Sequence, residues 1–90
     1  MIICKVVGHL WATKKDEKLN GQKLMIVRES ESGKKQDDIF VAADMVGAGM
    51  GELVLVVTGS TARKAGGSDS LPVDSAIVAI IDSLEIDRSK

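Results

Sequence analysis

One stretch of the chain, Val41–Arg63 (VAADMVGAGMGELVLVVTGSTAR), places the strongest limits on its fold. Glycine stands at every second position from Gly47 to Gly51, and an apolar run lies on either side of this triplet. Glycine reaches backbone conformations with positive φ that other residues avoid, and it lets two backbones approach closely. The residues after the triplet favour a strand, so we predict a turn or bulge between two strands.

Composition limits the class of protein. Ninety residues form one domain, and nine glycines with a single proline favour β structure joined by tight turns. The net charge of −1 provides no strong field to attract nucleic acid or an anionic membrane. The lone cysteine, Cys4, excludes an internal disulfide, and Lys5 interrupts the first apolar run too early for a signal peptide. No run approaches the ~20 residues of a membrane helix, so we expect a soluble intracellular domain.

The apolar pattern predicts five short strands and one helical turn. We expect the strands at Met1–Thr13, Lys23–Glu29, Ile39–Met45, Glu52–Thr58 and Ser75–Asp82, with polar loops at Lys14–Asn20, Ser30–Asp38 and Ser68–Pro72. Ser60 is placed to cap a helical turn through Ala65, and Gly8 marks a bend or bulge in the first strand. The predicted fold is all-β, a five-stranded antiparallel barrel of oligonucleotide/oligosaccharide-binding (OB) shape spanning residues 1–82, with a tail at 83–90.

The fourth and fifth expected strands are apolar on both faces, although a barrel has a single interior that buries one parity of each strand. In the fourth strand, the side chains left outside are either Leu53, Leu55 and Val57 or Val54 and Val56. In the fifth strand, they are either Ile77 and Ala79 or Val78 and Ile80. Exposure of such side chains creates a hydrophobic patch on the surface, and contact with a second subunit is the simplest way to bury it. We therefore predict self-association, with Val54, Val56, Val78 and Ile80 as interface candidates.

No chemical site can be assembled from these residues. Cys4 and His9 lie on opposite parities of one strand, so neither can activate the other, and a metal needs three or four convergent ligands. The run GAGMG precedes a strand rather than the helix that a dinucleotide-binding fold requires, and GSTARK lacks the spacing of a phosphate-binding P-loop. We expect no cofactor, no metal and no enzymatic activity.

Two binding functions are the alternatives to a structural role. An oligomeric OB-like module could bind a small ligand at its glycine turn, or it could bind nucleic acid. Binders of single strands combine a basic groove with aromatic platforms. Trp11 and Phe40 are the aromatic residues here, and no basic cluster flanks either, which makes the nucleic-acid alternative weak.

Two separated motifs resemble a known family. Asp44–Ala65 (DMVGAGMGELVLVVTGSTARKA) followed by Pro72–Asp82 (PVDSAIVAIID) is similar to the EutN/CcmL family of bacterial microcompartment vertex proteins. The N-terminal run KVVGHLWATKKDEKLNGQKLMIV also fits that family's opening strand, charged loop and glycine turn. The resemblance covers the chain to about Asp82, with both motifs in the same order as in the family.

The resemblance implies a small β-barrel that assembles as a cyclic homopentamer. Such pentamers cap the vertices of polyhedral shells tiled by hexameric shell proteins in the bacterial cytoplasm, a structural role without nucleic acid or membrane partners. By the same resemblance, Gly47, Gly49, Gly51 and Glu52 are candidates for the region near the subunit contacts or the five-fold axis. Ser60, Thr61 and Arg63 belong to the second part of the motif and are candidates to support that packing.

Overall fold

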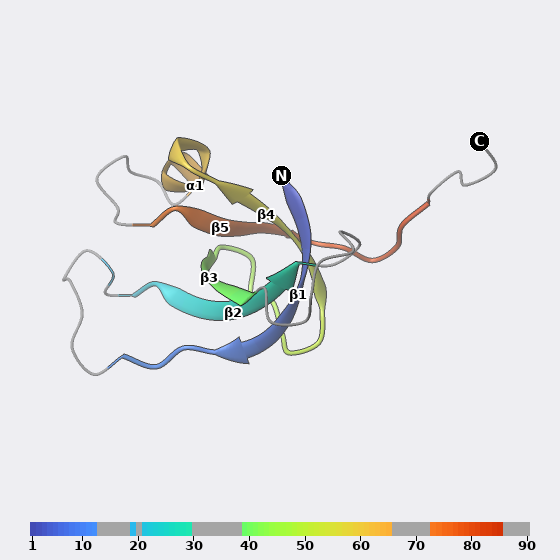
Figure 1. Ribbon diagram of the computed structural model, residues 1–90, viewed down its shortest axis with the longest axis horizontal. Helices are drawn as coiled ribbons and strands as arrows, with labels where there is room; N and C mark the ends of the chain where they lie inside the picture. The colour runs from blue at the N-terminus through green and yellow to red at the C-terminus, as the bar shows by residue number, and fades with distance from the viewer. Residues whose placement is uncertain (13–18, 20, 30–38, 66–72, 86–90) are drawn as a thin grey trace.

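The computed structural model describes residues 1–12, 19, 21–29, 39–65 and 73–85. It contains five strands and one helix in these parts of the chain (Figure 1): β1 (Ile2–His9), β2 (Lys23–Glu29), β3 (Ile39–Asp44), β4 (Leu53–Thr58), α1 (Ser60–Ala65) and β5 (Ser75–Ile80). The number and order of the predicted elements are confirmed. The loops expected at Lys14–Asn20 (apart from Leu19), Ser30–Asp38 and Ser68–Pro72 lie outside the described residues.

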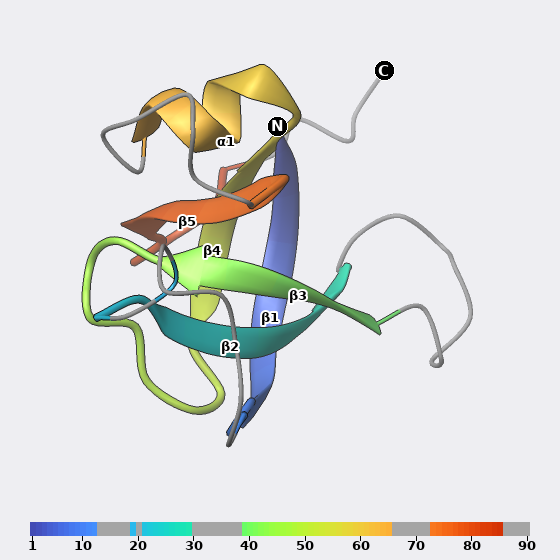
Figure 2. The same ribbon diagram turned by 90° about the vertical axis from the view of Figure 1, so that its left-hand side faces the viewer.

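The strands close into a barrel in the order β1-β2-β3-β5-β4 (Figure 2). Four of the five neighbouring pairs are antiparallel, but β3 and β5 run parallel, with Ala43 opposite Ala76 and Asp44 opposite Ile77. The predicted five-stranded OB-like barrel is confirmed, and it is antiparallel in every neighbouring pair except this one. The reason is parity: five strands cannot alternate in direction around a closed ring, so one neighbouring pair must be parallel.

Gly8 lies at the predicted irregularity of β1. The register between β1 and β2 shifts between Val6 and Gly8, so that Val6 faces Val27 while Gly8 faces Ile26. Such a shift is the mark of a bulge, which bends a strand and increases its twist. Strand β1 lies between β4 and β2 and bends along its length, as Figure 1 shows.

The interior of the barrel is filled by apolar side chains, which come mainly from alternate positions of the strands. These buried residues are Cys4, Val6, Met25, Val27, Ala42, Ala48, Val54, Val56 and Ile77, and Ile2, Phe40 and Ile80 pack against them. Alternate positions on each strand face outwards, as the two-residue period of a strand requires. A single protomer therefore already seals its interior.

Helix α1 covers part of the outer surface, beside β4 and β5 (Figure 1). Ala62 packs there against Val57 and Ala76 in a second buried cluster, joined by the partly buried Met45 and Val78. A register shift between Leu55 and Val56 in the β4–β5 pairing accompanies the burial of both Val56 and Val57. Part of the two-sided apolar pattern is therefore explained by this helix rather than by a second subunit.

The chain leaves the barrel after β5. The amide of Ile81, just after β5, donates a hydrogen bond to the carbonyl of Leu53 at 2.8 Å. Residues 82–85 are exposed and extend away from the strands (Figure 1). The division into a domain of residues 1–82 and a tail at 83–90 stays a prediction. Of the helices in the described part of the chain, none has the length and apolar character to cross a membrane.

Candidate functional site

The glycine loop between β3 and β4 (residues 45–52) is organised by the carboxylate of Asp44. Its Oδ1 accepts hydrogen bonds from the amides of Val46 (3.0 Å) and Gly47 (3.1 Å), and its Oδ2 accepts one from the amide of Ala48 (2.9 Å). The Asp44 side chain has 0% exposure, and Lys23 Nζ lies 4.0 Å from Oδ2. An aspartate that bonds backbone amides two to four residues ahead fixes a turn without secondary structure.

A second carboxylate holds the other half of the loop. Glu52 Oε1 accepts the amide of Gly49, and the Glu52 amide donates to the Gly49 carbonyl at 3.2 Å. The loop is also tied to β1, because the Val6 carbonyl accepts the Gly51 amide (2.9 Å) and the Val6 amide donates to the Glu52 carbonyl (3.0 Å). The loop is therefore a rigid extension of the barrel.

The three glycines of the loop have different reasons to be glycine. Gly47 and Gly51 have positive φ values of 75° and 81°, and a Cβ at either position would meet nothing within 4 Å. Gly49 has no positive φ, but a Cβ there would stand 3.1 Å from Glu52 Oε1. The prediction of a turn that needs positive φ is confirmed at two of the three positions.

Sequence reasoning missed the role of Asp44, which stood in the quoted motif without a function. The signal was available, because an aspartate followed three residues later by glycine is typical of a turn closed by the side-chain carboxylate. The sequence alone does not show that Asp44, the last residue of β3, points its carboxylate towards the amides of the loop.

Ser60, Thr61 and Arg63 lie on α1, at the far end of β4 from the glycine loop. The six residues of β4 separate the two groups by roughly 20 Å at the usual rise per residue. Ser60 and Thr61 are exposed, and Ser60 is the first residue of the helix, while its role as a cap stays a prediction. The structure therefore does not bring the two predicted groups together in one protomer.

Two of the four interface candidates are wrong. Val54 and Val56 each have 0% exposure and belong to the core of their own barrel, so they offer no surface to a partner. The partly exposed apolar side chains of β4 are those of Leu53 and Leu55. Sequence patterning left both sets open because every residue in this strand before Thr58 is apolar.

The other two candidates, Val78 and Ile80, are partly exposed at the end of β5. Val78 packs beside the α1 cluster and Ile80 packs against the main core. Each therefore retains some outward surface, and their place in an interface stays a prediction.

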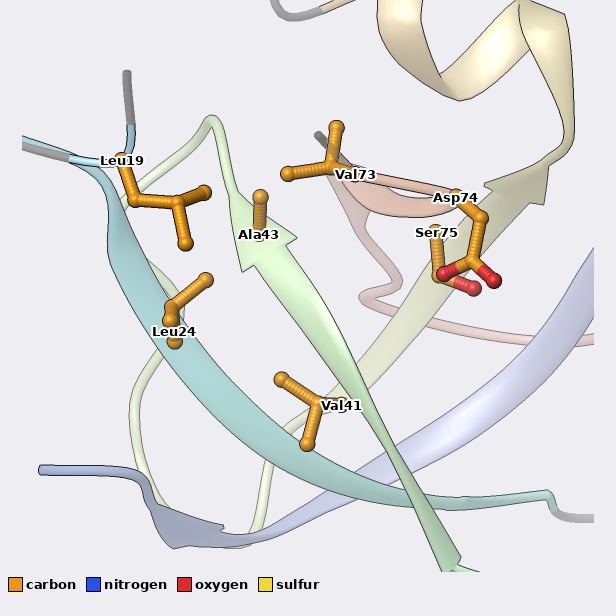
Figure 3. A pocket seen from close by; sticks show the side chains of 7 residues that line it. All are labelled: Leu19, Leu24, Val41, Ala43, Val73, Asp74 and Ser75. Carbon is orange, nitrogen blue, oxygen red and sulfur yellow. The ribbon is translucent and has the colours of Figure 1, made fainter. Parts of the chain in front are cut away.

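An apolar groove runs over the outside of β2 and β3, with a volume of about 210 Å³. Its lining is mostly apolar but includes the carboxylate of Asp74, and we therefore call it the acidic groove. The lining residues are Leu19, Leu24, Val41, Ala43, Val73, Asp74 and Ser75. In Figure 3, Leu19 and Leu24 stand on one side and Asp74 and Ser75 on the other. A neighbouring hollow of about 430 Å³ shares Val41, Asp74 and Ser75, so Asp74 borders both.

The titratable groups of the described residues form no reactive site. Burial, with a smaller contribution from the charge of Glu29, raises the pKa of the Cys4 thiol to about 11, which keeps it protonated and a poor nucleophile at neutral pH. In the parts of the chain that the structure describes, no three His, Cys, Asp or Glu side chains gather in a group that could hold a metal ion.

These features define the class: a closed five-stranded OB-like barrel with one short helix, a rigid glycine loop and an uncovered apolar outer surface. The family model for "Ethanolamine utilisation protein EutN/carboxysome" matches residues 1–82. The chain therefore belongs to the EutN/CcmL family, as the motifs indicated.

Named relatives are similar along nearly their whole length. The chain is 42% identical over 86 residues to the bacterial microcompartment shell vertex protein GrpN of Rhodospirillum rubrum, covering 94% of this chain and 97% of GrpN. It is 42% identical over 89 residues to the carboxysome shell vertex protein CcmL of Synechococcus elongatus, covering 98% and 90% of the two chains.

Solved structures share the fold. The pentameric microcompartment shell protein GrpN from Rhodospirillum rubrum superposes with a TM-score of 0.83 at 39% identity, covering 97% of this chain and 100% of that one. CcmL of Gloeobacter violaceus superposes with a TM-score of 0.87 at 38% identity, covering 97% and 91%.

Proposed function

We propose that this chain is a structural shell protein whose homopentamers cap the vertices of a polyhedral bacterial microcompartment. The observation that carries the proposal is similarity over almost the full length to proteins named as shell vertex proteins, one of them described as pentameric. A sheet of hexagonal tiles stays flat, and closure requires five-fold units at its corners. The pentamer supplies the geometry that the hexamers lack.

The protomer's own surface supports assembly. Its barrel is sealed inside, yet Leu53, Leu55 and the acidic groove still present apolar surface on the outside among the described residues. A cyclic ring requires two unlike patches on each subunit, so that the first patch of one copy meets the second patch of the next. Uncovered apolar surface at two places on one barrel is what such a ring requires.

The proposed function also implies the partners and the cellular location of the protein. Its partners are four further copies of itself and hexameric shell proteins, within the cytoplasm of a bacterium and without nucleic acid or membrane. Its contribution is mechanical rather than enzymatic, in keeping with a thiol held protonated by burial and a net charge of −1. No cofactor is required for this role.

We also propose that the glycine loop packs near the subunit contacts or the five-fold axis. Gly47 and Gly51 are exposed and would carry no side chain into a close contact between copies, while Asp44 and Glu52 keep the loop in one shape. Ser60, Thr61 and Arg63 on α1 support packing at the other end of β4.

Shell closure tests this function. Hexameric shell proteins of the same bacterium are expressed with and without this chain, and the particles are compared by electron microscopy. We expect closed polyhedra with the chain and open sheets or tubes without it. Closed polyhedra in both cases would contradict the vertex role. Retention of the purified protein on single-stranded DNA that declines with salt would favour the nucleic-acid alternative instead.

A further inference from the structure

Two like charges face each other on the outside of the barrel. Lys5 of β1 lies directly opposite Arg28 of β2, and Leu53 of β4 lies opposite Lys5 on its other side. Ile3 and Leu55 form the next pair along the same outer surface. We call Ile3, Lys5, Arg28, Leu53 and Leu55 the cationic face. Like charges directly across a strand pair are destabilising, so this arrangement does not serve the isolated protomer.

Arg28 is also incompletely satisfied. Its Nε is buried and has no hydrogen-bond partner within the described residues. A buried donor without an acceptor is costly, and a guanidinium presents a rigid fork that matches a carboxylate. Because Nε itself is buried, a docking partner would reach Arg28 through the exposed part of its side chain, and a carboxylate there would offset the repulsion from Lys5.

The acidic groove has this chemistry. Asp74 is exposed at the border of two apolar hollows, and Val41 and Ser75 also line both (Figure 3 shows the first of them). The groove lies over β2 and β3, whereas the cationic face is centred on β1. The two surfaces adjoin at β2, which carries Arg28 of one and Leu24 of the other, and they are unlike in charge, as the two patches of a ring subunit can be.

We propose that the cationic face of one copy docks on the acidic groove of the next, with Arg28 and Lys5 against Asp74 of the neighbouring copy. The occupant is a second copy of this chain, because one chain carries both halves, complementary in charge and both apolar at their margins. This inference rests on the proposed homopentamer and names the surfaces that hold it together.

Charge reversal tests the pairing. Native mass spectrometry at micromolar concentration compares the wild type with Arg28→Glu, Asp74→Arg and the double variant, and circular dichroism checks that each barrel is folded. We expect each single variant to raise the concentration needed for half assembly by about tenfold or more, because like charges then meet at every interface. The double variant restores the pentamer, because the two exchanged charges again attract each other across the interface. Asp82→Lys, a charge reversal at an exposed position after β5 and outside both surfaces, is the control and leaves the pentamer unchanged.

Mixing the two single variants sharpens the test. In an alternating ring, each contact would join opposite charges, but a ring with an odd number of members cannot alternate completely. We therefore expect the mixture to assemble less well than the double variant. Pentameric single variants, or a folded double variant that stays dissociated, would overturn the pairing and leave the proposed function standing. A wild type that is itself monomeric would count against the proposed function instead.

Discussion

The inside and the outside of the barrel are built from the same kinds of residue but reach different states. Inside, Val54 and Val56 of β4 are fully buried by their own chain. Outside, Leu53 and Leu55 of the same strand are left partly exposed, whereas the part of the surface beside α1 is covered. When a strand is apolar on both faces, one of the two faces can be buried in the core of its own chain, so only the other is available for a subunit interface. One set makes the fold, and the other set is available for assembly.

The largest expected difference between the two faces comes from placing the same charge on the inner and on the outer face of β4. Val54→Glu buries a carboxylate in the core and should cost more than about 4 kcal/mol, enough to unfold the protomer. Leu55→Glu, on the outer face of the same strand, should leave the barrel folded and weaken the pentamer. Circular dichroism and urea unfolding measure the first effect, and native mass spectrometry measures the second. Equal loss of fold in both variants would erase the distinction.

The next largest effect concerns the loop that joins the two regions. Asp44→Asn removes the charge and one of the two acceptor atoms that hold the amides of Val46, Gly47 and Ala48. We expect the free energy of unfolding to fall by about 2–3 kcal/mol, since bonds to a charged acceptor are the stronger ones. Chemical denaturation gives the value, and Asp82→Asn at an exposed position is the matched control. A change no greater than that of the control would contradict the organising role of Asp44.

The dependence of stability on alkaline pH tests whether the Cys4 thiol is shielded from water inside the barrel. The pKa of Cys4 is raised from 9.0 to about 11, so the folded state disfavours the thiolate relative to the unfolded chain. The stability this contributes is complete below pH 9 and is lost as pH rises from 9 to 11, by roughly 2–3 kcal/mol for two pH units. The difference in unfolding free energy between wild type and Cys4→Val, measured across this range, should show the loss. A flat difference would mean that water reaches the thiol.

The smallest expected effect separates the reasons for the loop glycines. Gly47→Ala forces a Cβ into a positive-φ conformation and should cost about 1 kcal/mol. Gly47→Asn should cost less, because asparagine tolerates this conformation. Thermal unfolding resolves the order of the two variants. If alanine were the better tolerated residue, backbone conformation would not explain this position.

Much of the fold could be predicted from the sequence because local signals were strong. The expected strand Lys23–Glu29 and helical turn Ser60–Ala65 match β2 and α1 to the residue. The parallel β3–β5 pair was not anticipated, although it follows from the closure of five strands. The inward side of β4 was undetermined, because LVLVV carries no polar residue to mark a face and the register shifts after Leu55.

The candidate site was less predictable than the fold. Positive φ at Gly47 and Gly51 followed from glycine spacing, but the loop's dependence on Asp44 depends on where that carboxylate points in three dimensions. Likewise, the opposition of Lys5 and Arg28 is a matter of strand register, which two distant segments decide together. Contacts of this kind are set by the whole barrel rather than by any one run of residues.

The mass of the purified wild-type protein tests the central claim most directly. Native mass spectrometry at micromolar concentration should find a particle of five chains, five times the 9.5 kDa of one copy. The uncovered outer surface predicts that this particle persists on dilution towards the lower micromolar range. A stable folded monomer at these concentrations would contradict the account, since the outer face would then need no second copy.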